Sequence, residues 1–240
     1  MINNLLNRLC EEQQNNTSGG IYHTLQVLLT YNSNHIEGSQ LTQEQTCYIF
    51  ETNTMPTSGE VVSSDDILET IHHFQAVDYC IAHVEEDTSE ALIKQLHYII
   101  KHDTSDSRKT WFNVGDYKQL PNSIGGIYPT VQPEHVGLAI GELLDWYNSQ
   151  SEVTLGTIVE FHVRFEKIHP FQDGNGRVGR LVAFHQALHN NVVPFIVEDN
   201  KKLAYYEALQ CWDDNPSALY DFCKNGQHTI QELIDYYRIV

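Results

Sequence analysis

Residues 168–180 read Ile168-His169-Pro170-Phe171-Gln172-Asp173-Gly174-Asn175-Gly176-Arg177-Val178-Gly179-Arg180. An apolar pattern at helical spacing precedes this run from Leu155 to Phe165, and a second one follows it from Leu181 to Leu188. Because a proline disfavours helical geometry at the residue before it, the first helix should end near His169. The sequence therefore predicts two helices joined by a glycine-containing loop.

The residue types in this loop suit a polyphosphate. Gly174 and Gly176 permit a tight turn in which backbone N–H groups converge on an anion at the start of the second helix. Arg177 and Arg180 are three residues apart, so they can share one polyphosphate through forked hydrogen bonds. Asp173 supplies a hard oxygen ligand that suits a bridging Mg²⁺.

His169 is the nearby side chain that can accept a proton near neutral pH, which makes it the natural general base for an attacking hydroxyl. The alternative is a plain connection in which the glycines only turn the chain and His169 is a packed cap. For a lone Gly-x-Gly that interpretation would be the better one. Here a base, a metal ligand, an anion loop and two cations fall within residues 169–180, so the pattern favours a catalytic site.

The run resembles the signature of the Fic family, His-Pro-Phe-x-(Asp or Glu)-Gly-Asn-Gly-Arg-x-x-Arg, and every specified position is present. The resemblance implies a mainly α Fic fold, a helical bundle with a small β-hairpin flap before the active-site helix-loop-helix. It also implies transfer of AMP from ATP to a Ser, Thr or Tyr hydroxyl of a protein target, with release of pyrophosphate. The same chain is an expected target of its own activity.

The resemblance also assigns roles to single residues. His169 deprotonates the target hydroxyl, Phe171 anchors the loop in the core, and Asp173 holds Mg²⁺ on the α- and β-phosphates. Asn175 and the loop amides of Gly174 and Gly176 hold the phosphates. Arg177 binds the β-phosphate and Arg180 meets the γ-phosphate.

A second motif lies far upstream, at Ser33-Asn34-His35-Ile36-Glu37-Gly38. Ser33 and Glu37 share one face of a helix that Gly38 can end, although alone this pattern indicates only a cap and a turn. Beside the signature it resembles the inhibitory motif of the Fic class with an N-terminal inhibitory helix. The resemblance implies that Glu37 competes with the γ-phosphate for Arg180, so that bound ATP has its α-phosphate turned away from attack.

Glycines and prolines punctuate residues 114–133 and predict a β-hairpin. Residues 114–130 resemble the Fic flap, which can pair with an extended target segment, with Ile124 as its clamping side chain. The alternative is an edge ribbon without that role. Tyr206 and Asp213 fall where the family places adenine contacts, but Asp213 replaces the usual asparagine and cannot donate an amide hydrogen.

Composition limits the other options. With 240 residues, 41% of them hydrophobic, and no apolar stretch long enough to cross a bilayer, the chain is expected to be globular and to have no membrane partner. Residues 1–8 do not read as a secretory signal, which favours the cytoplasm. A net charge of −18 disfavours general nucleic-acid binding. Five scattered cysteines without a CxxC pair disfavour a disulfide framework or a zinc knuckle.

Further helical windows lie at residues 92–100, 136–147 and 217–237, and residues 52–64 are expected to form a loop. We expect N-terminal helices over residues 1–50, including the motif at 33–38, and a Fic core over residues 51–240, together forming one compact unit. His185 and His189 are four apart but lack an evident third metal ligand, so they are expected to be surface or core residues, as are His72, His73 and His162.

Several functions stay open at the level of sequence. The chain can be an AMP transferase, a Fic-fold transferase of another nucleotide or phosphate-containing group, or a nucleotide-binding module without turnover. Removal of AMP from a modified target, with Glu37 positioning water, is a fourth alternative. Intact His169 and Asp173 disfavour the non-catalytic module. Dimerisation through the helical surface is compatible with the sequence but is not indicated by it.

Overall fold

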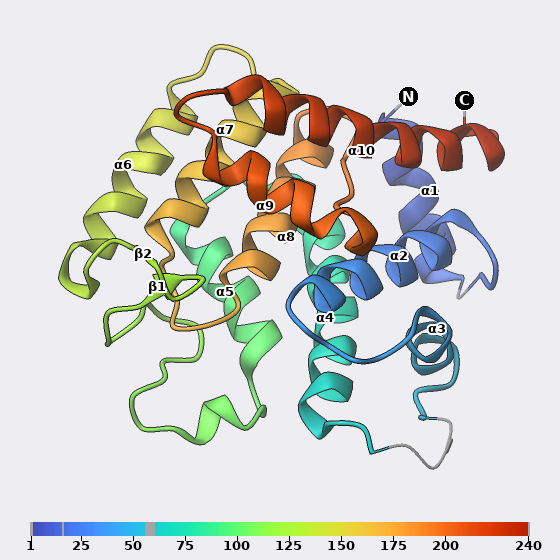
Figure 1. Cartoon of the computed structure of the whole chain (residues 1–240). Coiled ribbons are helices and arrows are strands. Elements are labelled where there is room, and N and C mark those ends of the chain that lie inside the picture. Colours follow the sequence, from blue (N-terminus) through green and yellow to red (C-terminus); the bar gives the residue numbers. More distant parts are fainter. Residues whose placement is uncertain (1, 16, 56–60, 240) are drawn as a thin grey trace.

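The computed structural model describes residues 2–15, 17–55 and 61–239, and it shows the expected mainly α bundle with a small hairpin (Figure 1). Its α-helices and β-strands are α1 (Ile2–Gln14), α2 (Ile21–Ile36), α3 (Gln43–Thr52), α4 (Ser64–Ala82), α5 (Glu90–Lys101), β1 (Ser123–Ile124), β2 (Tyr128–Pro129), α6 (Val136–Asn148), α7 (Leu155–Ile168), α8 (Asn175–His189), α9 (Lys202–Gln210) and α10 (Pro216–Tyr236). The helical windows of the sequence are thus confirmed as α5, α6, α7, α8 and α10.

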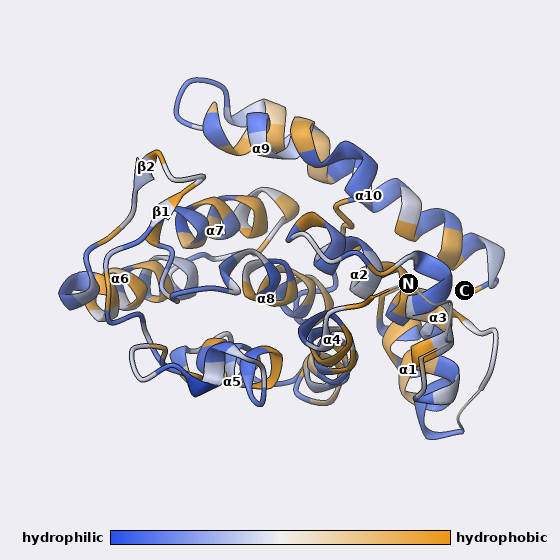
Figure 2. Ribbon diagram, turned by 60° about the horizontal axis from the view of Figure 1, so that its bottom comes forward, coloured by the Kyte–Doolittle hydropathy of each residue, from blue (hydrophilic) through white to orange (hydrophobic). Residues whose placement is uncertain are grey.

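Helix α8 lies in the middle of the bundle, and α7, α4, α5 and α2 pack around it (Figures 1 and 2). Its buried side chains include Val178, Leu181, Val182 and Phe184, which occupy different sides of the helix. Residues 181–188 are all buried, so this stretch of α8, which also carries His185 and Gln186, is enclosed on every side. This enclosure fixes the N-terminal end of α8, which carries the signature loop.

The two ends of that loop have defined backbone conformations. Helix α7 ends at His169, which has the left-handed φ of 53° and donates its N–H to the Phe165 carbonyl oxygen at 2.9 Å. Gly174 then caps α8 with a φ of 81°, in the region that glycine adopts without steric cost. The predicted helix end near His169 is therefore confirmed.

The N-terminal helices share the main apolar core with the later ones. Leu9 of α1 and Leu25 of α2 belong to the same buried cluster as Val77 of α4 and Leu181 of α8. Helix α2 ends where the sequence predicts, because Glu37 caps it and Gly38 follows with a φ of 106°. The division of the chain near residue 50 stays a prediction.

The predicted hairpin is confirmed, although each of its strands is only two residues long. Ile124 pairs with Tyr128 in antiparallel register, and Gly125 and Gly126 form the turn with φ values of 59° and 74°. The expected loop at residues 52–64 is shorter than predicted, because Thr52 still belongs to α3 and Ser64 already begins α4. Residues 56–60 of that loop lie outside the described residues.

His185 and His189, which were expected to be surface or core residues, contact backbone carbonyl groups. Nε2 of His185 lies 3.0 Å from the His83 carbonyl oxygen, and Nδ1 of His189 lies 2.7 Å from that of Val84. Both rings are therefore engaged by the backbone. Throughout the described part of the chain, no helix combines the length and the apolar character that a bilayer crossing requires.

We expect Gly226→Ala to destabilise the protein. Gly226 lies in α10, where an added Cβ would overlap the Ile196 carbonyl oxygen of the adjoining segment. Overpacking of this kind costs about 1–3 kcal/mol, which outweighs the better helix propensity of alanine, and should lower Tm by at least about 2 °C. The control is Gly141→Ala in α6, where no described atom comes within 4 Å of the added Cβ. Thermal unfolding should show an unchanged or raised Tm for the control; equal Tm values for the two variants would contradict the close packing of α10.

Candidate nucleotide-binding site

His169 is held in one orientation by the end of α7. Its Nδ1 lies 3.2 Å from the Glu166 carbonyl oxygen, and because a carbonyl can only accept, Nδ1 carries the proton. Nε2 then keeps its lone pair. Burial lowers the pKa of the imidazole, so it is neutral at pH 7. Orientation, tautomer and charge all suit the predicted proton acceptor.

Phe171 is fully buried and packs face to face on the His97 ring of α5, with centroids 3.9 Å apart. Nδ1 of His97 accepts the Gly115 N–H at 2.9 Å, so Nε2 of the same ring donates to the Asp173 carbonyl oxygen at 3.2 Å. Burial lowers the pKa of His97 to about 3, which keeps the ring neutral. His97 thus joins the loop to the segment before the flap. Sequence analysis missed it because it lies on the apolar face of a helix.

Asn175 bonds the backbone of its own loop. Its Oδ1 accepts the Phe171 N–H at 2.7 Å and its Nδ2 donates to the Phe171 carbonyl oxygen at 2.8 Å. The side chain is buried and holds the loop closed. The asparagine thus shapes the loop, and the contact of Asn175 and the loop amides with phosphate stays a prediction.

Asp173 lies at the exposed side of a charge network. Its Oδ2 lies 2.7 Å from Nζ of Lys101 and 3.2 Å from the Arg177 guanidinium. Although burial acts to raise its pKa, these two cations, Arg177 first, hold the pKa of the carboxyl well below its usual range. Glu69 of α4 accepts from Lys101 at 2.7 Å and from Arg177 at 2.5 Å, and Asp106 also accepts from Lys101 at 2.7 Å.

Lys101 and Glu69 were not found from the sequence, since single charges on amphipathic helices usually face solvent. The network leaves Asp173 ionised and its side chain 53% exposed. In proteins, Mg²⁺ is usually bound by one or two carboxylates together with the phosphates of the substrate. Asp173 therefore fits the Mg²⁺ that the resemblance implies.

The Arg180 side chain contacts the C-terminal end of α2. Its Nε donates to Ser33 Oγ at 3.0 Å, and its NH2 group donates to the Ser33 carbonyl oxygen at 2.9 Å and to Glu37 Oε1 at 2.7 Å. The arginine side chain is only 9% exposed. The carboxylate of Glu37 also lies over Gly176, because a Cβ added there would overlap it. The three residues that the two motifs placed together are therefore in contact.

Glu166 is a further acidic group beside this cluster that the sequence did not indicate. An added Cβ at Gly179 would overlap its Oε1, and burial raises its pKa to about 8. The side chain is therefore mostly protonated at pH 7. As a neutral group it does not compete with Glu37 or a phosphate for the charge of Arg180.

The flap is bonded directly to the signature loop. The Lys118 N–H donates to the Pro170 carbonyl oxygen at 2.9 Å, and Asn122 Nδ2 donates to the Phe171 carbonyl oxygen at 2.8 Å. Lys118 Nζ in turn reaches Asn122 Oδ1 at 2.7 Å. Ile124 is half-buried at the following strand, and its contact with a target stays a prediction.

The two predicted adenine contacts lie in different surroundings. The hydroxyl of Tyr206 is 3.5 Å from the Ile36 carbonyl oxygen, which places it beside the end of α2. Asp213 is largely exposed, and its carboxylate lies 2.6 Å from Nζ of Lys167. Lys167 precedes His169 by two residues. The contacts of Tyr206 and Asp213 with adenine stay predictions.

Comparisons with known proteins agree with this geometry. Residues 87–187 match the model of the Fic/DOC family. Protein adenylyltransferase fic-1 of Caenorhabditis elegans is 30% identical over 115 residues, which are 45% of this chain and 22% of that protein. Protein adenylyltransferase fic-1 of Caenorhabditis briggsae is 24% identical over 97% of this chain and 46% of its own length. The chain spans less than half the length of these curated relatives.

Solved structures share the fold over almost the whole chain. A Fic domain containing signaling protein from Bacteroides thetaiotaomicron has a TM-score of 0.72 at 22% identity, covering 98% of this chain and 93% of its own. Fic-1 from Caenorhabditis elegans has a TM-score of 0.74 at 22% identity, covering 98% and 69%. These structures show that the chain has the Fic fold, and residues 87–187, which contain the complete signature at the N-terminal end of α8, match the Fic/DOC family model.

Proposed function

We propose that the chain is a protein adenylyltransferase that moves AMP from ATP to a hydroxyl side chain of a protein target. The observation that carries the proposal is the neutral imidazole of His169, with its Nε2 lone pair available, beside the loop that begins α8. The similarity of the chain to curated protein adenylyltransferases supports it. Asp173, Arg177 and Arg180 supply the charges that a triphosphate needs.

In the proposed reaction the target hydroxyl oxygen attacks the α-phosphorus and its proton passes to Nε2 of His169. The bond between the α-phosphorus and the bridging oxygen breaks, and pyrophosphate leaves. The backbone amides at the start of α8, together with Arg177, hold the phosphates in line, so the chain contributes position and charge more than covalent help. Mg²⁺ at Asp173 would neutralise charge on the α- and β-phosphates.

The contact of Glu37 with Arg180 supports autoinhibition as part of the proposal. A carboxylate oxygen at 2.7 Å occupies the guanidinium position that a γ-phosphate would use. Since Ser33 still holds Nε of Arg180, removal of Glu37 frees one edge of the guanidinium without releasing the side chain. ATP can then bind with its α-phosphate facing His169.

The wider setting is also proposed. The flap supports docking of an extended target segment, and a second copy of this chain is one such target. We propose a cytoplasmic enzyme with no nucleic-acid partner, in keeping with the net charge of −18. The alternative of AMP removal draws on the position of Glu37 over Gly176, from which its carboxylate can orient a water molecule.

We expect Glu37→Gly to raise AMP transfer by about 10-fold or more, because a charge-assisted contact that competes with ATP is lost. His169→Ala should lower the rate of the Glu37→Gly protein by about 10²–10⁴-fold, since the proton acceptor is gone. Self-modification by ATP labelled at the α-phosphate measures both.

The matched control is Glu85→Gly, which removes one exposed carboxylate from the turn beside the far end of α8. It should leave the rate unchanged. Wild-type rates in Glu37→Gly would refute the inhibitory contact, and full activity in His169→Ala would refute the base.

The nucleotide is tested with Glu37→Gly protein and α-labelled ATP, CTP, GTP and UTP. We expect labelling from ATP at least about 10-fold above the others, the size of discrimination that one specific contact can give. Equal labelling by all four would contradict adenine selection by Tyr206 and Asp213. Preferential labelling by another nucleotide would favour the alternative donor.

The histidine is expected to titrate below its ordinary pKa of 6.5, because burial disfavours the imidazolium. Glu37→Gly should lower the midpoint further, since a negative charge that favours the imidazolium is removed. NMR of the histidine ring protons across pH measures this, with the His169→Ala spectrum identifying the signal. A midpoint at or above 6.5 would contradict a neutral base in a buried setting.

A further inference from the structure

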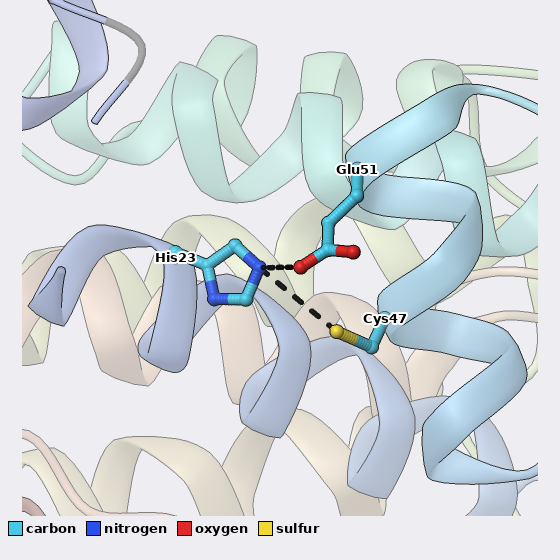
Figure 3. Close-up of side chains that lie close together, drawn as sticks. All are labelled: His23, Cys47 and Glu51. Atoms are coloured by element: carbon cyan, nitrogen blue, oxygen red, sulfur yellow. Dashed lines mark hydrogen bonds and ion pairs between the residues drawn. The ribbon is translucent and has the colours of Figure 1, made fainter. Parts of the chain in front are cut away.

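Three potential metal ligands meet on the N-terminal helices. His23 of α2 faces Cys47 and Glu51 of α3, one helical turn apart (Figure 3). Nε2 of His23 lies 3.0 Å from Glu51 Oε1 and 3.9 Å from Cys47 Sγ, and all three ligand atoms lie within 4.8 Å of one another. None of these residues takes part in the nucleotide site.

The spacing of these atoms suits a tetrahedral ion. Zinc–ligand bonds of about 2.0 Å to nitrogen or oxygen and about 2.3 Å to sulfur place the ligand atoms of a set with one sulfur about 3.3–3.5 Å apart. The separations of 3.0 and 3.9 Å from His23 Nε2 lie on either side of that range, and the Cys47 and Glu51 ligand atoms lie within 4.8 Å of each other. Small side-chain rotations would bring all three atoms to one ion.

The surroundings favour a cation with an open position. An open hollow of about 610 Å³ adjoins the three residues. Its described lining includes Glu44, one turn before Cys47, and contains no lysine or arginine. The His23 ring is also held edge-on by Phe50, with centroids 5.3 Å apart, so its orientation does not depend on Glu51 alone.

We propose that His23, Cys47 and Glu51 bind a Zn²⁺ ion, with water or the Glu44 carboxylate as the fourth ligand. One imidazole nitrogen, one thiolate and one carboxylate oxygen form a set that suits this borderline-soft ion, whereas Mg²⁺ and Ca²⁺ prefer oxygen ligands only. The ion binds the neutral imidazole of His23 through Nε2, with the ring proton on Nδ1, and it binds Cys47 as the thiolate, whose proton is released to solvent.

Such an ion would link α2 to α3 across the segment between His23 and Glu51. Since the unfolded chain does not hold these ligands together, binding stabilises the folded state. The linked helix α2 is the one that carries Ser33 and leads into Glu37, so the ion would also restrain the inhibitory element. That last consequence rests on the proposed function, while the binding of the ion does not.

The test is titration of the metal-free protein with Zn²⁺ in the presence of excess Mg²⁺, which occupies oxygen-only sites such as Asp173. We expect one equivalent to bind, and Cys47→Ser and His23→Gln each to weaken binding by at least about 10–100-fold. Zn²⁺ at about 100 times its Kd should raise Tm by about 5–10 °C, and only in proteins that keep all three ligands. Co²⁺ in place of Zn²⁺ should give the thiolate-to-cobalt charge-transfer absorption.

The matched controls are Cys10→Ser and Cys211→Ser, which remove half-buried thiols outside the cluster. Both should keep full affinity and the cobalt absorption. Circular dichroism without metal verifies that His23→Gln and Cys47→Ser are folded, as their part-exposed positions lead us to expect. Full affinity in Cys47→Ser, or no stoichiometric binding by the wild type, would overturn the proposal; neither result bears on AMP transfer.

Discussion

The structure of the site depends on the largely buried guanidinium of Arg180, which requires a negatively charged partner. The Arg180 side chain is 9% exposed, and a guanidinium at such a position is costly unless its donors are paired. Ser33 accepts a hydrogen bond from Nε of the guanidinium, and the Glu37 carboxylate supplies the opposite charge. When no phosphate is present, the end of α2 is therefore the natural occupant of the anion position. The N-terminal helices belong to the site for this electrostatic reason as well as through the shared apolar core.

A second charge cluster, around Arg177, has a different balance. Glu69, Asp106 and Asp173 offset Lys101 and Arg177 at the exposed edge of the loop, so the cations on this side of the site are already paired before any ligand arrives. At the proposed γ-phosphate position, Glu37 is the one described carboxylate that pairs with Arg180, because the neighbouring Glu166 is mostly neutral. The two halves of the triphosphate would thus meet a paired network on one side and a displaceable carboxylate on the other.

Much of this could be predicted because the active elements are contiguous in sequence. Residues 169–180 contain the proposed base, the loop and both arginines, and the proline and glycines fix where α7 ends and α8 begins. The contact between Glu37 and Arg180 spans 143 residues, and it was expected only from the resemblance to a known motif. Spacing alone gives no such pairing.

The features that escaped prediction share a physical cause. Glu69, His97 and Lys101 lie on helices whose patterns also suit a plain amphipathic surface or core, and only packing reveals that they meet the loop. The bonds of Asn175 to the Phe171 backbone were not expected, because an asparagine in a loop can bond the backbone or a ligand with equal ease. The group of His23, Cys47 and Glu51 has no motif spacing, since its members come from two helices that only the fold places together.

Gly176 limits how the enzyme can be released from its proposed inhibition. The Glu37 carboxylate lies against Gly176, in the space that a side chain at this position would fill. In the proposed site a phosphate would approach the amides of α8 through the same space. A mutation at residue 176 that expels the glutamate would obstruct ATP as well. Constitutively active variants should therefore arise by changes on the α2 side, so natural regulation is expected to act through displacement of that helix and leave the loop itself intact.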